Sequence, residues 1–356
     1  VHLCAYDAAP SSAPLYVVEG GATEAALRAC HRLRMVQGES FTPILYIAPD
    51  AQSISRRAGL ECGADTSLAR PLEASELLAQ IASLLRIKER HDHLASRAAE
   101  AHRISERLQE ATAQIDQELE LARRLQESFL PQTLPKVPRV KFAVKYKPCA
   151  QVGGDFYDIV RLDEKHFGFY VADAMGHGVP ASLLTIFVKK GVRGKEITGQ
   201  SYHLVSPTEV LERLNRDLIE QQIPDLPFIT MVYVLFNSTD GTLELSRAGH
   251  PYPLYLPRDG KPALWQMEGS LLGVFDTRFR VKTHQLLPGD KLVLYTDGMD
   301  AASFREHPVG LASLLAAAAE FQRLPIDELV ERLTSDLFTQ TRQSDDLTVF
   351  GVEMLE

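Results

Sequence analysis

The chain has 356 residues, a length that accommodates two or three domains of ordinary size. Its 38 Lys and Arg stand against 47 Asp and Glu, and the net charge of −9 argues against binding to nucleic acid or to an anionic membrane surface. Apolar residues make up 45% of the chain and charged residues 24%, which indicates folded globular domains rather than disorder.

The cysteines and the apolar runs predict the cellular compartment of the protein. The cysteines are widely spaced and form no CxxC pair, so we expect neither a disulfide scaffold nor a zinc site: Cys4, Cys30, Cys62 and Cys149. No apolar run is long enough to span a membrane, and residues 1–7 lack both a Met and the pattern of a signal peptide. We therefore predict a cytoplasmic protein with no membrane contact, present here as a fragment or a processed chain.

The first segment, residues 1–85, alternates short apolar runs with helical stretches. The apolar runs, which we expect to be strands, are residues 15–18, 43–47 and 66–69. The helices are expected at residues 22–34, 53–59 and 74–85. Continuous apolar strands that alternate with helices are typical of a parallel sheet covered on both faces, so we expect a small α/β domain.

The second segment, residues 86–130, contains no Gly and no Pro. Apolar residues recur at every seventh position: Ile87, Leu94, Ala101, Leu108, Ile115, Ala122 and Phe129. A second row, three residues later, is only half apolar because Arg90, Arg97 and Glu118 interrupt it. A sustained heptad pattern predicts a coiled coil, and we expect it to form a homodimer. The alternative is one long helix that packs on its own chain.

The third segment, residues 131–356, is rich in β-branched strands and turns. Its strands are expected at residues 140–146, 166–172, 228–236, 242–246, 253–256, 291–296 and 345–353, with the fourth paired to the fifth across a turn. Its helices are expected at residues 180–190, 208–221, 311–321 and 326–338. Because strands far outnumber helices, we predict an α+β domain of largely antiparallel sheets with helices outside.

Four aspartates in the third segment stand at the ends of apolar strands: Asp155, Asp173, Asp297 and Asp345. A carboxylate at the end of a buried strand is costly unless it is paired or binds a metal ion, and no matching Arg or Lys stands nearby in the sequence. Carboxylate oxygens are the ligands that Mg²⁺ and Mn²⁺ prefer. Any one of these positions could be only a turn, but the four together favour a metal site.

From about residue 120 to 356 the chain resembles the metal-dependent protein phosphatases of type 2C, in particular the bacterial SpoIIE-type branch. Six stretches carry the resemblance, in the order typical of the family: residues 122–131 (ARRLQESFLP), 152–158 (VGGDFYD), 171–181 (VADAMGHGVPA), 248–251 (AGHP), 295–298 (YTDG) and 345–348 (DDLT). The resemblance implies two packed antiparallel sheets flanked by helices, and metal-dependent hydrolysis of phosphoserine or phosphothreonine in proteins.

The resemblance also implies a role for each aspartate. Asp173 is expected to bridge two Mn²⁺ or Mg²⁺ ions. Asp297 and Asp345 are expected to complete one metal site, and Asp155 with the backbone carbonyl of Ala174 the other. The two ions would activate a water for direct attack on phosphorus, without a phosphoenzyme. The four aspartates are the predicted catalytic residues, and together with Ala174 they are the predicted metal ligands.

Neighbouring residues leave alternatives open. Asp158 and Asp346 are expected either to orient metal-bound waters or to be solvated turn residues. His177 and His250 are expected to have structural roles, with proton donation to the leaving group as the alternative for His177. No Arg stands at a spacing typical of a phosphate clamp.

Residues 13–88 resemble the C-terminal two-thirds of a response-regulator receiver domain. The resemblance is carried by residues 15–19 (LYVVE), 44–48 (ILYIA), 59–65 (GLECGAD) and 69–72 (ARPL). Three departures remove the receiver's chemistry, because Glu19 replaces the phosphorylated Asp, Ala48 the hydroxyl residue, and Arg70 the Lys before Pro. We therefore predict a pseudo-receiver that binds a protein or no ligand at all.

Together these patterns predict a cytoplasmic bacterial protein phosphatase regulated through its pseudo-receiver and coiled coil. The resemblance implies that the substrate is a phosphorylated anti-sigma-factor antagonist of the STAS type, in a partner-switching pathway. We also predict that the long helix transmits a change of dimer packing to the metal site that contains Asp155. The alternatives are a non-catalytic scaffold that binds a phosphoprotein, and a small-molecule phosphohydrolase, although the chain has no Gly-rich nucleotide cradle.

Overall fold

The computed structural model describes residues 13–20, 24–38, 40–176, 178–199, 201–222, 228–299, 311–338 and 345–356. Residues 1–7 and Cys4 therefore lie outside the described ranges. The chain forms two compact units, Val1–Ala113 and Gln114–Glu356. None of the described helices has both the length and the apolar character that a membrane crossing requires.

The first unit is built around a parallel three-stranded sheet in the order β1-β2-β3. Its elements alternate along the chain: β1 (Tyr16–Glu19), α1 (Ala25–Val36), β2 (Ile44–Ala48), α2 (Ser53–Glu61), β3 (Thr66–Ala69) and the beginning of α3 (Ala74–Phe129). The central strand is apolar throughout because both of its faces are covered. Ile44 packs into one core cluster, and Leu45 packs into another with Leu68 and Leu84. The predicted α/β arrangement is confirmed, whereas the receiver resemblance stays a prediction.

A single helix of 56 residues, α3, takes the place of the two helices predicted at residues 74–85 and 86–130. It continues without a break because it contains neither Gly nor Pro, and it ends two residues before Pro131. Four large apolar residues of the heptad row are between 50% and 66% exposed: Ile87, Leu94, Leu108 and Ile115. Dimerisation through this row stays a prediction.

Two antiparallel five-stranded sheets form the second unit, in the orders β13-β10-β9-β6-β5 and β12-β11-β14-β15-β4. In chain order the strands are β4 (Val140–Lys147), β5 (Asp155–Arg161), β6 (His166–Ala174), β9 (Ile229–Asn237), β10 (Thr242–Ala248), β11 (Leu254–Leu256), β12 (Ala263–Leu264), β13 (Val281–Gln285), β14 (Lys291–Tyr295) and β15 (Leu347–Met354). A hairpin of β7 (Lys195–Thr198) and β8 (Ser201–Leu204) forms a separate two-stranded sheet. The two large sheets share a core, in which the Phe169 and Phe350 rings stack with centroids 5.1 Å apart.

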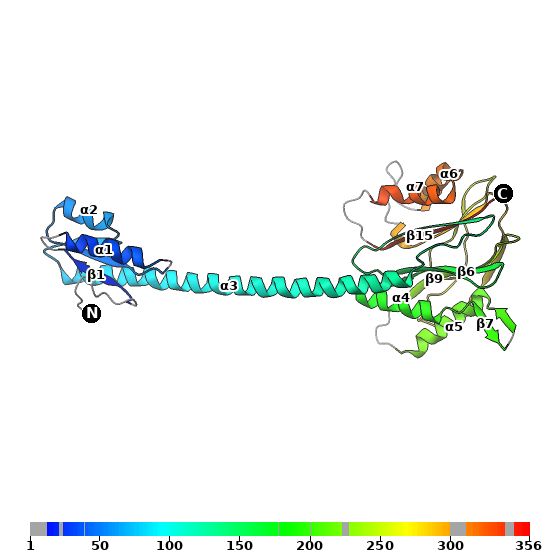
Figure 1. Ribbon diagram of the computed structural model, residues 1–356, viewed down its shortest axis with the longest axis horizontal. Helices are drawn as coiled ribbons and strands as arrows, with labels where there is room; N and C mark the ends of the chain where they lie inside the picture. Colours follow the sequence, from blue (N-terminus) through cyan, green and yellow to red (C-terminus); the bar gives the residue numbers. More distant parts are fainter. Residues whose placement is uncertain are drawn as a thin grey trace. The chain divides into compact units, whose positions relative to one another are not determined.

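Helices cover the outer faces of the two sheets, as Figure 1 shows for the second unit. On one side lie α4 (Val179–Gly191) and α5 (Pro207–Glu220), and on the other α6 (Leu311–Phe321) and α7 (Ile326–Phe338). The sequence sets the start of α5 locally, because the Ser206 hydroxyl accepts a hydrogen bond from the Glu209 N–H and Pro207 occupies the first turn. The predicted layered α+β fold is confirmed.

The predicted pairing of residues 242–246 with residues 253–256 is wrong. β10 lies between β9 and β13, so both of its edges are already hydrogen-bonded to other strands. The chain turns at Gly249, whose φ of +63° suits glycine, and β11 then joins the other sheet beside β14. A Gly-containing stretch between two strands indicates a turn, but it does not determine which strands pair.

Candidate functional site

Two of the four predicted aspartates lie side by side on neighbouring strands. Asp155 begins β5 and is paired in register with Asp173 on β6. Asp155 is only 1% exposed, and its Oδ2 atom accepts hydrogen bonds from the hydroxyls of Thr296 and Thr348, both at 2.7 Å. The two threonines belong to the other sheet, at the end of β14 and in β15. Both sheets therefore position this one carboxylate.

Negative charge accumulates around Asp173. Burial, and then the charges of Asp297 and Asp345, raise the pKa of Asp173 to about 7. Burial, and then the charge of Asp173, raise the pKa of Asp155 well above its usual value. The structure thus pairs Asp155 with Asp173 and places Asp297 and Asp345 near enough for their charges to act on Asp173. Among the described residues, no Lys or Arg forms an ion pair with Asp155 or Asp173.

The loop before β5 requires two glycines because it is tightly packed. A Cβ atom on Gly153 would lie 2.7 Å from the Asp346 carboxylate, and one on Gly154 would lie 2.5 Å from the Ala174 carbonyl oxygen. The Asp346 carboxylate accepts hydrogen bonds from the backbone N–H of Gly154 at 2.5 Å and of Cys149 at 2.7 Å. Asp346 is 2% exposed, so it is not a solvated turn residue; its carboxylate holds this loop in place.

Gln126, near the end of α3, contacts the same loop. Its side chain is buried, and its Nε2 donates to the Gly153 carbonyl at 2.7 Å while its Oε1 accepts from the Gly153 N–H at 3.1 Å. The Nε2 also donates to the hydroxyl of Thr185 in α4 at 3.3 Å. This role of Gln126 was not predicted from the sequence, although Gln126 lies within the first of the six stretches that resemble the phosphatases. The end of α3 is thus bonded to the loop that leads into Asp155.

Asp158 has surroundings that differ from both of its predicted alternatives. It lies on β5 with 6% exposure, and its carboxylate forms an ion pair with Lys189 of α4 at 2.9 Å. The pair joins a strand to the helix that covers it, which is a structural contact. His177 lies outside the described residues.

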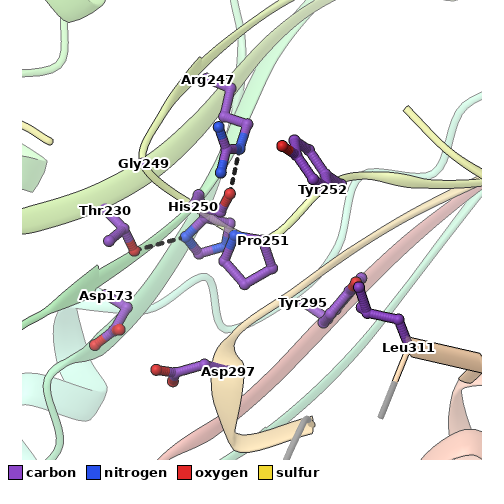
Figure 2. Close-up of a pocket in the computed structure, with 10 residues that line it drawn as sticks. All are labelled: Asp173, Thr230, Arg247, Gly249, His250, Pro251, Tyr252, Tyr295, Asp297 and Leu311. Carbon is purple, nitrogen blue, oxygen red and sulfur yellow. Dashed lines mark hydrogen bonds between the residues drawn. The ribbon is translucent and has the colours of Figure 1, made fainter. Parts of the chain in front are cut away.

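A cavity of about 270 Å³ opens beside the aspartates (Figure 2). Asp173 and Asp297 line it, together with His250 and Arg247. His250 is fully buried, and its Nδ1 lies 2.8 Å from the Thr230 hydroxyl. Burial, and then the nearby Arg247 charge, lower the pKa of His250 to about 3, so its ring is neutral. Arg247 was not predicted as a site residue, and the only signal in the sequence is its place just before the AGHP stretch.

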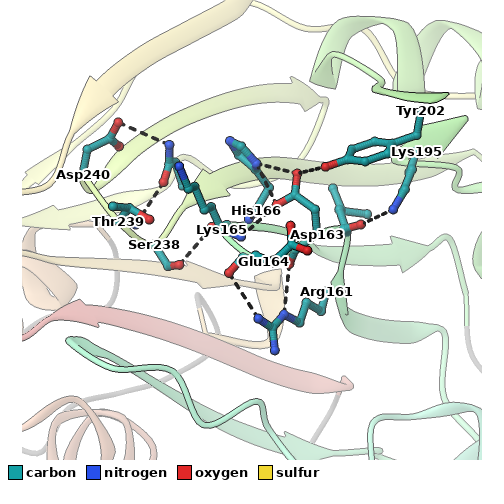
Figure 3. Close-up of polar contacts among 12 residues, drawn as sticks. Arg161, Asp163, Glu164, Lys165, His166, Lys195, Tyr202, Ser238, Thr239 and Asp240 are labelled. Carbon is teal, nitrogen blue, oxygen red and sulfur yellow. Dashed lines mark hydrogen bonds and ion pairs between the residues drawn. The ribbon is translucent and has the colours of Figure 1, made fainter.

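A second polar cluster, at the turn between β5 and β6, contains charged groups of both signs (Figure 3). The Asp163 carboxylate accepts a hydrogen bond from the Tyr202 hydroxyl at 3.0 Å and lies 2.9 Å from Nδ1 of His166. Burial by itself would raise the pKa of Asp163, but hydrogen bonds from Lys165 and His166 hold it below its usual range. This cluster fixes a turn against the β7–β8 hairpin and lacks the charge imbalance of the aspartate site.

The three residues that distinguish the predicted pseudo-receiver lie at the carboxyl ends of its strands. Glu19 ends β1, Ala48 ends β2 and Arg70 directly follows β3. The Arg70 guanidinium donates a hydrogen bond to the Glu19 carboxylate. The acidic group at the expected phosphorylation position is therefore paired within the first unit.

Comparison with known proteins gives a family match for the second unit. A family model described as Stage II sporulation protein E (SpoIIE) matches residues 163–355, more than half of the chain. Phosphoserine phosphatase RsbU of Bacillus subtilis (strain 168) is 29% identical over 188 residues, which cover 52% of this chain and 54% of that protein. Phosphoserine phosphatase RsbP of the same organism is 26% identical over 237 residues, covering 64% and 56%. The chain thus spans about half the length of the curated relatives it matches.

Solved structures show the same fold. A crystal structure of the RsbU and RsbW domains of a Mycobacterium tuberculosis protein is 27% identical, with a TM-score of 0.53 over 62% of this chain and 61% of that one. The SiaA-PP2C domain of Pseudomonas aeruginosa has a TM-score of 0.58 over 68% of this chain and 98% of that one, at 21% identity, which supports the fold alone. The family match includes Asp173, Asp297 and Asp345, whereas Asp155 precedes it.

Proposed function

This chain belongs to the SpoIIE family, and on that premise we propose that it is a metal-dependent phosphoserine/phosphothreonine protein phosphatase. The observation that carries the proposal is the crowding of Asp155, Asp297 and Asp345 around Asp173, in which the described residues form no ion pair with Asp155 or Asp173. The relatives RsbU and RsbP bear the name phosphoserine phosphatase, which supports the same chemistry.

The residues present fit two divalent cations, Mn²⁺ or Mg²⁺. Carboxylates whose pKa is raised by burial and mutual repulsion become stable as anions once a cation lies between them. Asp173 would bridge the two ions, Asp297 and Asp345 would hold one, and Asp155 with the Ala174 carbonyl would hold the other. Such ions supply Lewis acidity toward the phosphoryl group and lower the pKa of water.

The remaining residues would orient the metal ligands and would offer no nucleophile that competes with water. Thr296 and Thr348 engage one carboxylate oxygen of Asp155, so its other oxygen stays available for a cation. The Cys149 thiol lies near the site. Its sulfur and one carboxylate oxygen each of Asp345 and Asp346 all lie within 4.8 Å of one another. Burial, and then the charge of Asp346, raise the pKa of Cys149 to about 12. A thiol that is not ionised is a poor nucleophile, which supports direct attack by water.

We propose that the substrate is a phosphorylated protein, namely an anti-sigma-factor antagonist of the STAS type in a cytoplasmic partner-switching pathway. The SpoIIE family membership supports a bacterial signalling substrate of this class, and the names of the curated relatives support a phosphoserine substrate. An Asp173→Asn variant of the full chain, used as a substrate trap in native lysate, tests it. Capture of a phosphorylated STAS protein is expected, and capture of only non-STAS phosphoproteins would contradict it.

We further propose that α3 dimerises with a second copy and regulates the site. Four large apolar side chains at heptad spacing are exposed on it, and a second copy would bury them: Ile87, Leu94, Leu108 and Ile115. Gln126, on the same helix, is bonded to Gly153, two residues before Asp155. A change of packing along α3 would therefore shift the loop that leads into Asp155. Asp155 belongs to the proposed metal site with the fewest protein ligands.

Hydrolysis of p-nitrophenyl phosphate and of a phosphoserine peptide by the full chain tests the phosphatase proposal. Turnover that requires Mn²⁺ and that EDTA abolishes is the expected result. A protein that binds the phosphopeptide at saturating Mn²⁺ but never hydrolyses it would instead be a scaffold.

Replacement of Leu94, Leu108 and Ile115 by Glu tests the dimer, because like charges in the seam should give a monomer. Light scattering measures the mass, and turnover is measured against Mn²⁺ concentration. The matched control replaces three exposed residues off the heptad row by Glu: Ser96, Ala99 and Ala113. A monomer with unchanged turnover and unchanged Mn²⁺ dependence would show that the coiled coil only tethers two copies.

A Gln126→Ala variant tests the contact between α3 and the loop. Because the loop would lose two hydrogen bonds, we expect the Mn²⁺ concentration for half-maximal turnover to rise severalfold while turnover at saturating Mn²⁺ is largely kept. Gln114→Ala is the control, since Gln114 is exposed on the same helix. An unchanged Mn²⁺ dependence would contradict the proposed coupling.

A further inference from the structure

The cavity beside the aspartates contains an arginine that forms no ion pair with any described carboxylate. Arg247 lines this cavity and is partly buried. Its guanidinium donates to two backbone carbonyls, of His250 and of Met267, the latter at 2.9 Å. An arginine has five N–H donors, so these two bonds leave donors over. None of the ion pairs found among the described residues includes Arg247.

The neighbours of Arg247 orient its guanidinium but do not neutralise it. The guanidinium carbon lies 4.5 Å from the centre of the Tyr252 ring, which fixes its plane. The His250 ring is neutral, and the other lining side chains nearby, Pro251 and Leu311, carry no charge. A cation that is partly desolvated and unpaired is costly, and an anionic ligand would offset that cost.

The place of Arg247 in the cavity indicates which anion it would bind. Figure 2 shows His250 between the guanidinium and the two carboxylates of Asp173 and Asp297. A phosphoryl group at the aspartates and an anion at Arg247 would therefore occupy different parts of the cavity. A second anion that lies beside a bound phosphoryl group would come from another part of the same substrate.

We propose that Arg247 binds the carboxylate of an acidic side chain that flanks the phosphorylated residue of the protein substrate. The inference rests on the proposed phosphatase function and adds a basis for its specificity. The planar guanidinium can hold a carboxylate through two parallel hydrogen bonds, which a Lys ammonium cannot reproduce. Arg247 is thus a specificity-determining residue that selects phosphorylation sites with an acidic neighbour.

Binding of phosphoserine peptides to the full chain tests the proposal. Fluorescence anisotropy is measured at saturating Mn²⁺ on protein that carries Asp173→Asn, with peptides in which a single Asp is moved along positions near the phosphoserine, and with an all-Ala parent peptide. We expect one Asp peptide to bind about tenfold more tightly than the parent. Arg247→Gln should abolish that preference, and Arg247→Lys should retain only part of it. The control Arg280→Gln, at an exposed position, should keep the preference intact.

A charge reversal keeps the test decisive if Arg247→Gln disturbs the loop that its hydrogen bonds hold. Arg247→Glu should prefer the peptide with Lys at the selected position over the peptide with Asp. An equal loss of affinity for the Asp and parent peptides in every Arg247 variant would overturn the proposal, because Arg247 would then hold the phosphoryl group or the fold.

Turnover of the wild-type chain, measured in parallel, separates this inference from the proposed function. Turnover without any Arg247-dependent preference would contradict the inference alone. An Arg247-dependent preference in binding, without any turnover at saturating Mn²⁺, would contradict the phosphatase function and support the anion site.

Discussion

In the first unit, the Glu19 carboxylate at the end of β1 is bonded to the Arg70 guanidinium, whereas in the second unit Asp155 and Asp173 lie opposite each other without a basic partner among the described residues. Both places are strand ends, since Glu19 ends β1 and Asp155 begins β5. The difference teaches that the state of pairing, and not the mere presence of carboxylates, indicates what a strand end can bind. A paired carboxylate is already neutralised, while crowded carboxylates are stabilised by a bound proton or cation.

The largest expected effect is that of Asp173→Asn. The change removes a negative charge that two cations would share, so turnover of p-nitrophenyl phosphate at saturating Mn²⁺ should fall to less than about a tenth, a barrier increase of more than about 1.4 kcal/mol. The fold should stay intact by circular dichroism. Asp259→Asn, at an exposed turn, is the matched control. More than a tenth of wild-type turnover in Asp173→Asn would refute the two-metal hypothesis.

Asp158→Asn should distinguish the ion-paired Asp158 from Asp155, the proposed metal ligand on the same strand. Loss of the contact with Lys189 leaves a partly buried ammonium without its partner, so the free energy of unfolding should fall by about 1–3 kcal/mol. Denaturant titration in EDTA measures this change. Turnover at saturating Mn²⁺, below the unfolding transition, should stay close to wild type; a loss as large as that of Asp173→Asn would place Asp158 in the metal site.

Asp173 should make the stability of the metal-free protein fall as the pH rises, whereas an aspartate in an ion pair makes stability rise with pH. The pKa of Asp173 is raised from 3.8 to about 7, so the folded state binds this proton more tightly than the unfolded state does. The contribution of Asp173 to stability in EDTA should therefore be fully present below about pH 4 and be lost as the pH rises through about 7. Thermal unfolding across this range, with Asp173→Asn as the comparison, measures the slope. A variant with the same decline as wild type would show that other groups cause it.

The smallest expected effect is that of phosphodonors on the first unit. Because Glu19 is paired with Arg70 and Ala48 has no hydroxyl, acetyl phosphate or beryllofluoride should leave turnover and mass unchanged. Turnover and light scattering, with and without beryllofluoride, check this. A saturable response that disappears in Glu19→Ala would contradict the pseudo-receiver hypothesis.

The sequence by itself determined most of the elements and the four aspartates, because the signals for these are local. The strand at residues 66–69 and the helices at 311–321 and 326–338 were predicted with the bounds that the structure has. Apolar periodicity and the positions of Gly and Pro act within a few residues, so they can be recognised from the chain alone. The edge strand β13 lay outside the predictions because alternate residues along it are exposed and mostly polar.

Tertiary structure alone decided which residues meet, because those contacts join distant parts of the chain. Asp155 is held by Thr348, 193 residues away, and Gln126 contacts Gly153, 27 residues away. The pairing of β10 with β13 rather than β11, and the presence of Arg247 in the cavity, likewise depend on how the two sheets come together. No local pattern encodes such contacts, since burial and packing of the whole domain select them.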